Sequence, residues 1–426
     1  MTREAARQGG RAPHEAAFDA ALARLLPDGA PFGVAVSGGG DSTALMHLAA
    51  RRGAPPVATV DHGLRDGSAA EAMAVARAAA ALGLPHEILP WEWDRSGNLQ
   101  AAARDGRRRL LAEWAARRGL AWVLLGHTLD DQAETLVMRL ARGSGVEGLS
   151  AMEEANPPFL RPLLRIRRAS LREWLAERGV AWIEDPSNDD PRFERVRARR
   201  AIDALGLDPR RLSDTAARMA RAREALERRA VETARGLLRP CLPGDVALDR
   251  AGLVATDEDT RLRILGGALR HVAGAPHRPR EADLLRLAAD PGPRTLHGCV
   301  VRPWGDRLLI HREPAAVAAL RCALGEPWDG AWTLAAPSGE VGALGEDGAA
   351  RTAGRDEAGP GASDPGAGRY PRQALAAKPA LWEGGRLVGF APLGWGVPHE
   401  ARHAPPGGSF PGCLATRASP GRGHAH

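Results

Sequence analysis

The chain has 426 residues, of which 44% are hydrophobic, and a formal net charge of +6, so it has room for two or three folded domains. Only one of its 58 basic residues is a lysine, Lys378, and it does not follow a glycine-rich loop, which excludes a nucleotide-binding loop of the Walker type. The four cysteines form no Cys-x-x-Cys pair, and no apolar run could span a membrane or act as a secretory signal, so we expect a reduced, cytoplasmic protein without a zinc ribbon, an iron–sulfur cluster or a membrane partner.

Residues 32–150 alternate short apolar runs with amphipathic stretches, a pattern that is typical of parallel β-α-β units. The predicted strands cover residues 32–36, 57–60, 87–89 and 122–125. One predicted helix follows the first strand and ends at about Arg51, and three others cover residues 69–82, 99–118 and 130–142. In such a sheet, ligands bind beyond the carboxyl ends of the strands, so the loops after the strands are the candidate site.

The rest of the chain is more basic and then less regular. Residues 151–240 carry 20 arginines against 15 acidic residues, and residues 161–240 are predicted to form helices with Arg-rich faces. Such a surplus favours a polyanionic partner, although a solvated helical face is the alternative interpretation. A small α+β domain is predicted over 206–315, with helices 260–272 and 281–289 and strands 297–301 and 308–311. It is followed by a flexible linker over 336–369 and by a degenerate C-terminal module over 370–400, with a hairpin around Gly384-Gly385. The two ends of the chain, 1–13 and 401–426, are predicted to be disordered.

The first predicted strand leads into Ser37, Gly38, Gly39, Gly40, Asp41 and Ser42. Three glycines let the backbone approach an anion closely, and the helix that follows points its positive dipole end at the same place. Because Asp41 would repel phosphate, its presence here favours a pyrophosphate bridged by Mg²⁺. The alternative is a glycine-rich turn in which Asp41 or Ser42 only caps the helix.

The fourth predicted strand is followed by His127 and by a helix that carries Asp131 and Glu134 three positions apart, on one face. Two carboxylates so placed can hold an ammonium group or a metal ion. The alternative is a helix start that Thr128 or Asp130 caps, with the acids favoured by the helix dipole.

Taken together, these motifs resemble those of the tRNA(Ile)-lysidine synthetase family within the PP-loop ATP-pyrophosphatases. The resemblance covers residues 32–205 in order. It includes the Ser-Gly-Gly-Gly-Asp-Ser loop, Val60-Asp61-His62-Gly63-Leu64-Arg65, Gly126-His127-x-x-Asp130-Asp131-Gln132-x-Glu134-Thr135, Arg161-Pro162-Leu163-Leu164, the Trp182–Asn188 segment and Arg195-Val196-Arg197-Ala198-Arg199. It implies a PP-loop domain with a Rossmann-like parallel sheet over 14–205, and a tRNA-binding role for the α+β domain.

The resemblance also implies an activity, in which ATP adenylates C2 of the wobble cytidine of the CAU-anticodon isoleucine tRNA and free L-lysine then displaces AMP. It implies that residues 37–42 bind ATP, that Asp41 holds Mg²⁺, and that Asp131 and Glu134 are catalytic and bind lysine with His127. The positions that it places near tRNA are Arg104, Arg107, Arg195 and Arg199. The family usually has an aromatic residue where this chain has Arg108. The oligomeric state stays open, with a homodimer as one option.

Other activities share the same loop and are kept as alternatives. A tRNA cytidine or uridine thiolase would need a cysteine in the catalytic domain, but all four cysteines lie at or after Cys241. A small-molecule amidotransferase would need a glutaminase domain, of which the sequence has no sign. A catalytically inactive RNA-binding module would have no need for the intact loop and acidic segment.

Overall fold

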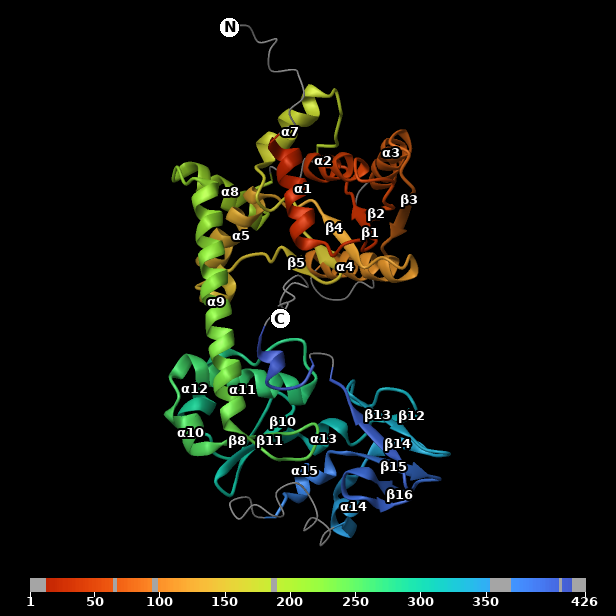
Figure 1. The fold of residues 1–426 in the computed structure, drawn as a ribbon, viewed down its shortest axis with the longest axis vertical. Coiled ribbons are helices and arrows are strands. Elements are labelled where there is room, and N and C mark those ends of the chain that lie inside the picture. The colour runs from red at the N-terminus through yellow and green to blue at the C-terminus, as the bar shows by residue number, and fades with distance from the viewer. Residues whose placement is uncertain are drawn as a thin grey trace. The chain divides into compact units, whose positions relative to one another are not determined.

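The computed structural model describes residues 13–63, 67–93, 99–184, 190–352, 369–405 and 408–415. The chain divides into two compact units, and the division falls inside helix α9 (Pro209–Leu237). Unit 1 comprises Met1–Arg223 and Ala418–His426, and unit 2 comprises Glu224–Arg417 (Figure 1). The predicted disordered segment 1–13 lies outside the described residues except for Pro13, which begins α1 (Pro13–Leu25).

Unit 1 contains a sheet of six strands in the order β3-β2-β1-β4-β6-β5. All neighbouring strands are parallel except the β5–β6 pair. The strands are β1 (Phe32–Ala35), β2 (Val57–Asp61), β3 (His86–Pro90), β4 (Trp122–Leu125), β5 (Ala155–Asn156) and β6 (Phe159–Leu160). The four strands predicted from the sequence are confirmed, and with them the parallel α/β fold.

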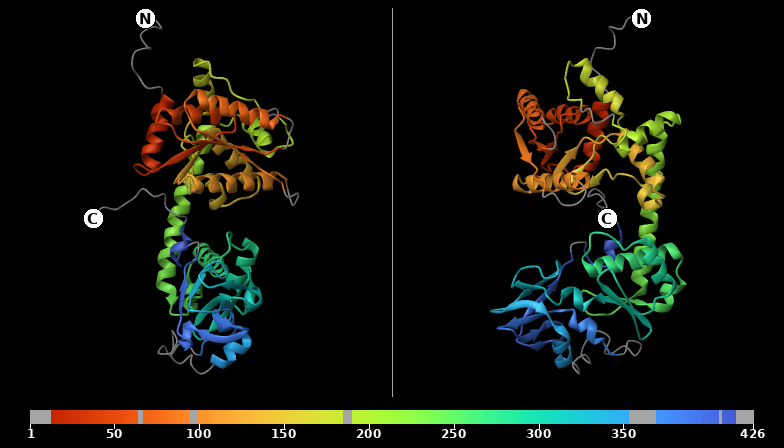
Figure 2. Two further views of the ribbon diagram at one scale, coloured as in Figure 1. Left: turned by 90° about the vertical axis from the view of Figure 1, so that its right-hand side faces the viewer. Right: turned by 180° about the vertical axis from the view of Figure 1, so that it is seen from behind.

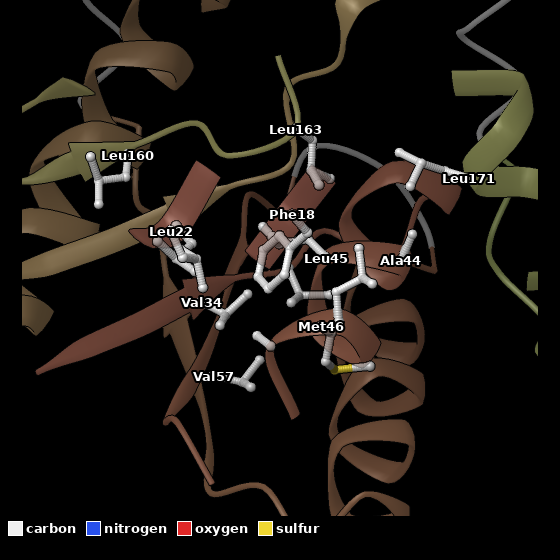
Figure 3. Packing of buried hydrophobic residues seen from close by; sticks show 14 of the residues in the cluster. Phe18, Leu22, Val34, Ala44, Leu45, Met46, Val57, Leu160, Leu163 and Leu171 are labelled. Carbon is white, nitrogen blue, oxygen red and sulfur yellow. The ribbon is translucent and has the colours of Figure 1, made fainter. Parts of the chain in front are cut away.

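Helices cover both faces of this sheet because alternate strand residues point in opposite directions. Val34 and Val36 pack with α1 and α2 in one apolar cluster (Figure 3), whereas Ala35 packs with Leu111 and Trp114 of α4 in another. Figure 2 accordingly shows α2 and α3 on one side of the strands and α4 on the other. The helices of unit 1 after α1 are α2 (Gly40–Ala50), α3 (Ser68–Ala81), α4 (Leu99–Arg117), α5 (Leu129–Ala141), α6 (Val146–Leu149), α7 (Arg168–Glu177) and α8 (Glu194–Ala204).

The strand order changes direction between β1 and β4, which places the loops after these two strands side by side. Ala35 is in register with Leu125 at the carboxyl ends of the two strands. A Cβ at Gly126 would lie 3.0 Å from the Cα of Ser42, so the loop after β4 directly abuts the loop after β1. Open parallel sheets bind their ligands at such a reversal, so the loops after β1 and β4 are the candidate site.

Unit 2 begins with a second sheet, which is antiparallel and runs in the order β7-β8-β11-β10-β9. Its strands are β7 (Leu238–Arg239), β8 (Val246–Asp249), β9 (Arg294–Leu296), β10 (Cys299–Trp304) and β11 (Arg307–Arg312). Its helices are α10 (Arg250–Ala255), α11 (Glu258–Ala273) and α12 (Glu281–Ala289). The predicted α+β character and the two predicted helices and strands are confirmed.

A further antiparallel sheet, in the order β12-β14-β15-β16-β17, follows α13 (Pro314–Val317), and β13 and β18 form a separate pair. The β15–β16 hairpin turns at Gly384 and Gly385, both with positive φ, as a two-residue hairpin turn requires. The elements are β12 (Arg321–Ala323), β13 (Trp332–Ala335), β14 (Glu340–Ala343), α14 (Gly345–Thr352), α15 (Arg372–Ala376), β15 (Pro379–Glu383), β16 (Arg386–Phe390), β17 (Trp395–Gly396), β18 (Glu400–His403) and two short 3₁₀ helices at Ala391–Leu393 and Gly412–Leu414.

Two predictions of flexibility are therefore wrong for part of their range. In the segment 336–369, β14 and α14 occupy residues 340–352 because Val341, Leu344 and Ala349 are fully buried there; residues 353–368 lie outside the described residues. In the segment 401–426, β18 pairs with β13, and Leu414 is buried against α11. Residues 406–407 and 416–426 again lie outside the described ranges.

Lys378, the only lysine, is buried inside unit 2. Its Nζ donates to Asp245 Oδ1 (2.5 Å) and to the carbonyl oxygen of Pro243 (2.9 Å), and Tyr370 donates to the other Asp245 oxygen. Its side chain is 2% exposed, so the pair connects the loop before β8 to the start of β15 without contact with water. None of the helices in the described part of the chain has the length and apolar character that crossing a membrane requires.

Candidate functional site

The loop of residues 37–42 joins β1 to α2 through hydrogen bonds of its own. Ser42 Oγ donates to the carbonyl oxygen of Gly39 (2.9 Å) and accepts from the backbone N–H of Ser37 (3.2 Å). Gly39 is the N-cap residue of α2, and no side chain caps this helix. The capping roles considered for Asp41 and Ser42 are therefore wrong: Ser42 closes the loop, and Asp41 points to other partners.

The glycines of this loop serve two different purposes. Gly38 has a φ of +88°, and a Cβ there would lie 2.5 Å from Ile183, so backbone geometry and packing both require glycine. At Gly39 and Gly40 the nearest atoms would be 3.9 Å and 3.5 Å from a Cβ, so no close contact requires glycine. Gly39 is partly exposed, whereas Gly40 is buried beside Arg172 and Trp182, so an anion such as pyrophosphate would meet the N-terminus of α2 at Gly39.

The segment after β4 places Asp131 and Glu134 on the buried face of α5. Thr128 is the N-cap, and Asp131 completes a capping box with it: Asp131 Oδ2 accepts from the Thr128 backbone N–H and from its hydroxyl, both at 2.8 Å. The two acids are 6% and 2% exposed. Thr128 thus caps the helix, as the alternative interpretation held. Capping, however, involves only one Asp131 oxygen and does not explain why the Glu134 carboxylate is buried.

Arg168, the first residue of α7, joins these acids to the glycine-rich loop. Its Nε donates to Asp41 Oδ2 (2.9 Å), its Nη1 to Glu134 Oε1 (3.1 Å) and its Nη2 to Asp131 Oδ1 (3.0 Å). One guanidinium therefore gathers three carboxylates from α2 and α5 at the point where the sheet reverses direction.

These contacts shift the protonation of the two aspartates differently. Burial raises the pKa of the Asp41 carboxyl above its ordinary value, although the charge of Arg168 acts in the opposite direction. For Asp131, burial also acts to raise the pKa, but the charges of Arg168 and Arg195 outweigh it and leave the pKa below its ordinary value. Asp131 therefore stays charged at neutral pH.

His127 lies beside this cluster as a neutral ring. Burial lowers its pKa to about 3, and the nearby arginine charges act in the same direction, whereas Asp131 opposes them. Its Nδ1 is buried and has no hydrogen-bond partner among the described residues. An imidazole with this pKa is a weak base, so it suits a hydrogen-bonding role near the acids better than proton transfer.

The arginines predicted near tRNA fall into two groups. On α8, Arg195 Nη1 lies 3.4 Å from Asp131 Oδ1, and Arg199 Nε lies 3.0 Å from Glu134 Oε1, so both line the acidic cluster. On α4, Arg107 is half-buried and interacts electrostatically with Arg195 and His62, while Arg104 is exposed. Arg108, at the position that is usually aromatic in the family, lies over the Phe159 ring at 5.0 Å. Arg65 lies outside the described residues.

The loop has the donor chemistry for a magnesium ion. Asp41 Oδ1 is buried and accepts no hydrogen bond from the described residues, so one carboxylate oxygen is left for a cation. Within the described ranges, no three His, Cys, Asp or Glu side chains form a ready metal cage. The single available oxygen of Asp41 suits Mg²⁺, which commonly binds through one carboxylate, waters and the phosphates of its substrate.

Arg168 is the site residue that the sequence reasoning missed. It lies in Arg165-Ile166-Arg167-Arg168, directly after the quoted Arg-Pro-Leu-Leu motif. A signal was available, because α7 has no acid in its first turn and begins with arginine, although a cation is unfavourable at a helix N-terminus. Such a placement indicates that partners elsewhere in the fold compensate for it.

Comparisons with known proteins identify the family of this chain. Residues 15–204 match the PP-loop domain family. The tRNA(Ile)-lysidine synthase of Ruegeria pomeroyi is 44% identical over 385 residues, which span 85% of this chain and 88% of that protein. Those of Methylobacterium nodulans and Rhodopseudomonas palustris are 45% and 42% identical, over 70% and 71% of this chain and 95% and 96% of their own lengths. This chain, which has a PP-loop domain over residues 15–204 and these relatives along most of its length, belongs to the tRNA(Ile)-lysidine synthase family.

Proposed function

We propose that this protein joins lysine to C2 of the wobble cytidine in the CAU-anticodon isoleucine tRNA, with ATP as the activating substrate. The observation that carries the proposal is the junction of the glycine-rich loop with Asp131 and Glu134 through Arg168. One part suits an anionic nucleotide, and the other suits a cationic amine. The relatives above are named tRNA(Ile)-lysidine synthases, which supports tRNA(Ile) as the substrate and lysidine as the product.

The proposed reaction has two steps. In the first, the oxygen on C2 of the cytidine attacks the α-phosphorus of ATP and pyrophosphate leaves, so that C2 carries an adenylate. In the second, an amine of lysine attacks C2, the C–O bond to AMP breaks, and the amine loses a proton. The products are lysidine in tRNA, AMP and pyrophosphate.

The loop of residues 37–42 would bind the phosphates of ATP in the first step. Its backbone at Gly39 and the N-terminus of α2 provide N–H groups and a positive dipole. Asp41 would hold Mg²⁺ through its unpartnered Oδ1. When bound, the ion would neutralise charge on the pyrophosphate.

The acidic cluster would act in the second step. Lysine enters as an ammonium ion, and a buried carboxylate can bind that ammonium and then accept its proton. Glu134 is suited to this role, since its Oε2 is buried without a partner among the described residues. Asp131 and His127 would complete the site, Asp131 as a charged neighbour and His127 as a neutral polar ring.

We also propose that tRNA approaches over α4 and α8. Arg104 is exposed on α4, and Arg195 and Arg199 remain partly exposed beside the acids that they contact. Arginine side chains there can neutralise backbone phosphates while the target base turns out of the anticodon loop. The α+β part of unit 2 would add further contacts to tRNA.

A tRNA thiolase remains the second candidate, and the cysteines count against it. All four are free thiols in unit 2, at Cys241, Cys299, Cys322 and Cys413. Burial raises the pKa of Cys241 and of Cys299 to about 12, so neither is a thiolate at neutral pH.

The deciding experiment incubates the purified protein with the isoleucine tRNA transcript, ATP, Mg²⁺ and lysine, and then digests the tRNA for nucleoside mass spectrometry. We expect a cytidine-derived nucleoside carrying the mass of lysine, formed only when both ATP and lysine are present. A sulfur-containing nucleoside, or pyrophosphate release that does not depend on tRNA, would overturn the proposal.

A further inference from the structure

The Arg168 guanidinium is shared between the two halves of the candidate site. Its three nitrogens each bind a different carboxylate, with Asp41 on the ATP-loop side and Asp131 and Glu134 on the α5 side. A guanidinium is planar and holds its donors at fixed angles, so these contacts also fix the position of Asp41 relative to Glu134. A lysine at this position would provide only a single point charge.

The hydrogen bonds made by each carboxylate oxygen show which atoms remain for ligands. Both Asp131 oxygens are engaged, one by Thr128 and the other by Arg168 and Arg195. Asp41 and Glu134 each give one oxygen to Arg168 and keep a second, buried oxygen with no partner among the described residues, namely Asp41 Oδ1 and Glu134 Oε2.

From this arrangement we propose that Arg168 is a positioning residue that couples the nucleotide loop to the amine site. It presents Asp41 Oδ1 to the metal–nucleotide complex and Glu134 Oε2 to the lysine ammonium, while Asp131 anchors the guanidinium. The assignment of the two ligands rests on the proposed function. The competing possibility is that Arg168 only occupies the place of the lysine ammonium and has to leave before lysine binds.

The first test is equilibrium binding of a non-hydrolysable ATP analogue, with and without Mg²⁺, in the absence of tRNA and lysine. We expect Arg168→Gln to weaken Mg²⁺-dependent binding roughly tenfold, because Asp41 loses its fixed position. In an Asp41→Asn background the same change should have little further effect. Additive losses in the double variant would show that Arg168 does not act through Asp41.

The second test is single-turnover transfer of lysine to tRNA that has already been adenylated by the wild-type protein. Arg168→Gln should raise the lysine concentration for half-maximal transfer roughly ten- to hundredfold, with a much smaller change in the maximal transfer rate. In a Glu134→Gln background, the same substitution should raise that concentration little further. Arg168→Lys should recover only part of the loss, since one ammonium cannot reproduce the three-way contact. Tighter lysine binding in Arg168→Gln would instead support the competing possibility and overturn the proposal.

A matched control is Arg165→Gln, which removes the same charge from an exposed arginine that pairs only with Glu154 in the described structure. It should behave like the wild type in both tests, and melting curves of all variants will reveal any loss of folding. If the wild type forms no lysidine, the proposed function fails, but the nucleotide test with Asp41 still decides whether Arg168 acts on the ATP loop.

Discussion

Asp41 places a negative charge in a loop that otherwise suits an anion. Arg168 pairs with its Oδ2, and a cation at the unpartnered Oδ1 would offset the repulsion between Asp41 and a bound phosphate. We therefore expect Asp41→Asn to reduce ATP-dependent adenylation of tRNA by at least about a hundredfold, since the charge that holds the metal is lost. The melting temperature and the affinity for tRNA should change little. Pyrophosphate release measures adenylation, filter binding measures the affinity for tRNA, and a melting curve gives the melting temperature. Normal pyrophosphate release would contradict the metal role.

Glu134 and Asp131 lie on the same face of α5, but their contacts differ: Glu134 has an oxygen without a partner among the described residues, whereas Asp131 is part of the capping box. Glu134→Gln should weaken lysine use roughly ten- to hundredfold, as expected for the loss of a buried carboxylate–ammonium contact, and adenylation should largely persist. Asp131→Asn should weaken lysine use as well, and should also lower stability by about 1 kcal/mol because Asp131 is part of the Thr128 capping box.

Lysine titrations of trapped adenylated tRNA, together with melting curves, separate these effects. A metal-binding role for the two acids would instead abolish adenylation in both variants. Unchanged lysine dependence in both variants would show that Asp131 and Glu134 do not form the amine site.

The contacts within the site show where sequence reasoning at single residues reaches its limit. The loop residues and the α5 acids could be predicted because each lies in a compact motif directly after a strand. For Arg168 the sequence offers only an indirect signal, an arginine at a helix start without acids, and this signal does not identify its partners. Those partners lie more than thirty positions away, at Glu134, and more than a hundred, at Asp41. Pairing of Arg195 and Arg199 with the acids also depends on how α8 packs on α5, which no local pattern encodes.

Among the elements, those that alternate strongly in hydrophobicity were predicted and those with few apolar residues were not. The four predicted strands of the six-stranded sheet and the β15–β16 hairpin each have an apolar run or a Gly-Gly turn. In contrast, β14 has the sequence Glu-Val-Gly-Ala, with only one large apolar residue, and α14 contains mainly glycine, alanine and charged residues. Their burial comes from neighbouring strands, so composition alone wrongly indicated a linker.

The central position of β14 leads to a test at the scale of elements. Replacing residues 340–352 with a Gly/Ser sequence of equal length should lower the melting temperature of unit 2 by more than about 10 °C or abolish its transition, since β14 lies between β12 and β15. An equal-length Gly/Ser replacement of residues 353–368, which are rich in glycine, alanine and proline, is the control and should change the melting temperature little. Equal losses from both replacements would contradict the structural role of residues 340–352.

At the scale of the whole molecule, unit 2 carries a pH dependence of its own. Burial lowers the pKa of His271 and of His403 to about 4, and their rings lie 5.8 Å apart. In the unfolded chain, these histidines take up protons near pH 6.5, whereas in the folded chain they do so only near pH 4. Between these values the unfolded state binds more protons, so the free energy of unfolding falls as the pH falls.

Calorimetry of the full chain should therefore show the melting temperature of unit 2 dropping by several degrees between pH 7.5 and pH 5. His403→Phe keeps a ring that can pack near Trp332 and removes one titrating group, so the drop should become smaller. An identical drop in the variant would show that other groups cause the pH dependence.

The buried position of Lys378 makes the chain almost inert to reagents that modify amines. Apart from the chain's α-amino group, its only primary amine is enclosed with Asp245 inside unit 2, while every other basic residue is an arginine. Reductive methylation with isotopically labelled formaldehyde should therefore modify Lys378 only during the moments when unit 2 opens. The labelling rate at this one atom would give the opening frequency of unit 2 in the intact protein, read from the Lys378 methyl signal, with the methylated α-amino group as the second signal in the NMR spectrum.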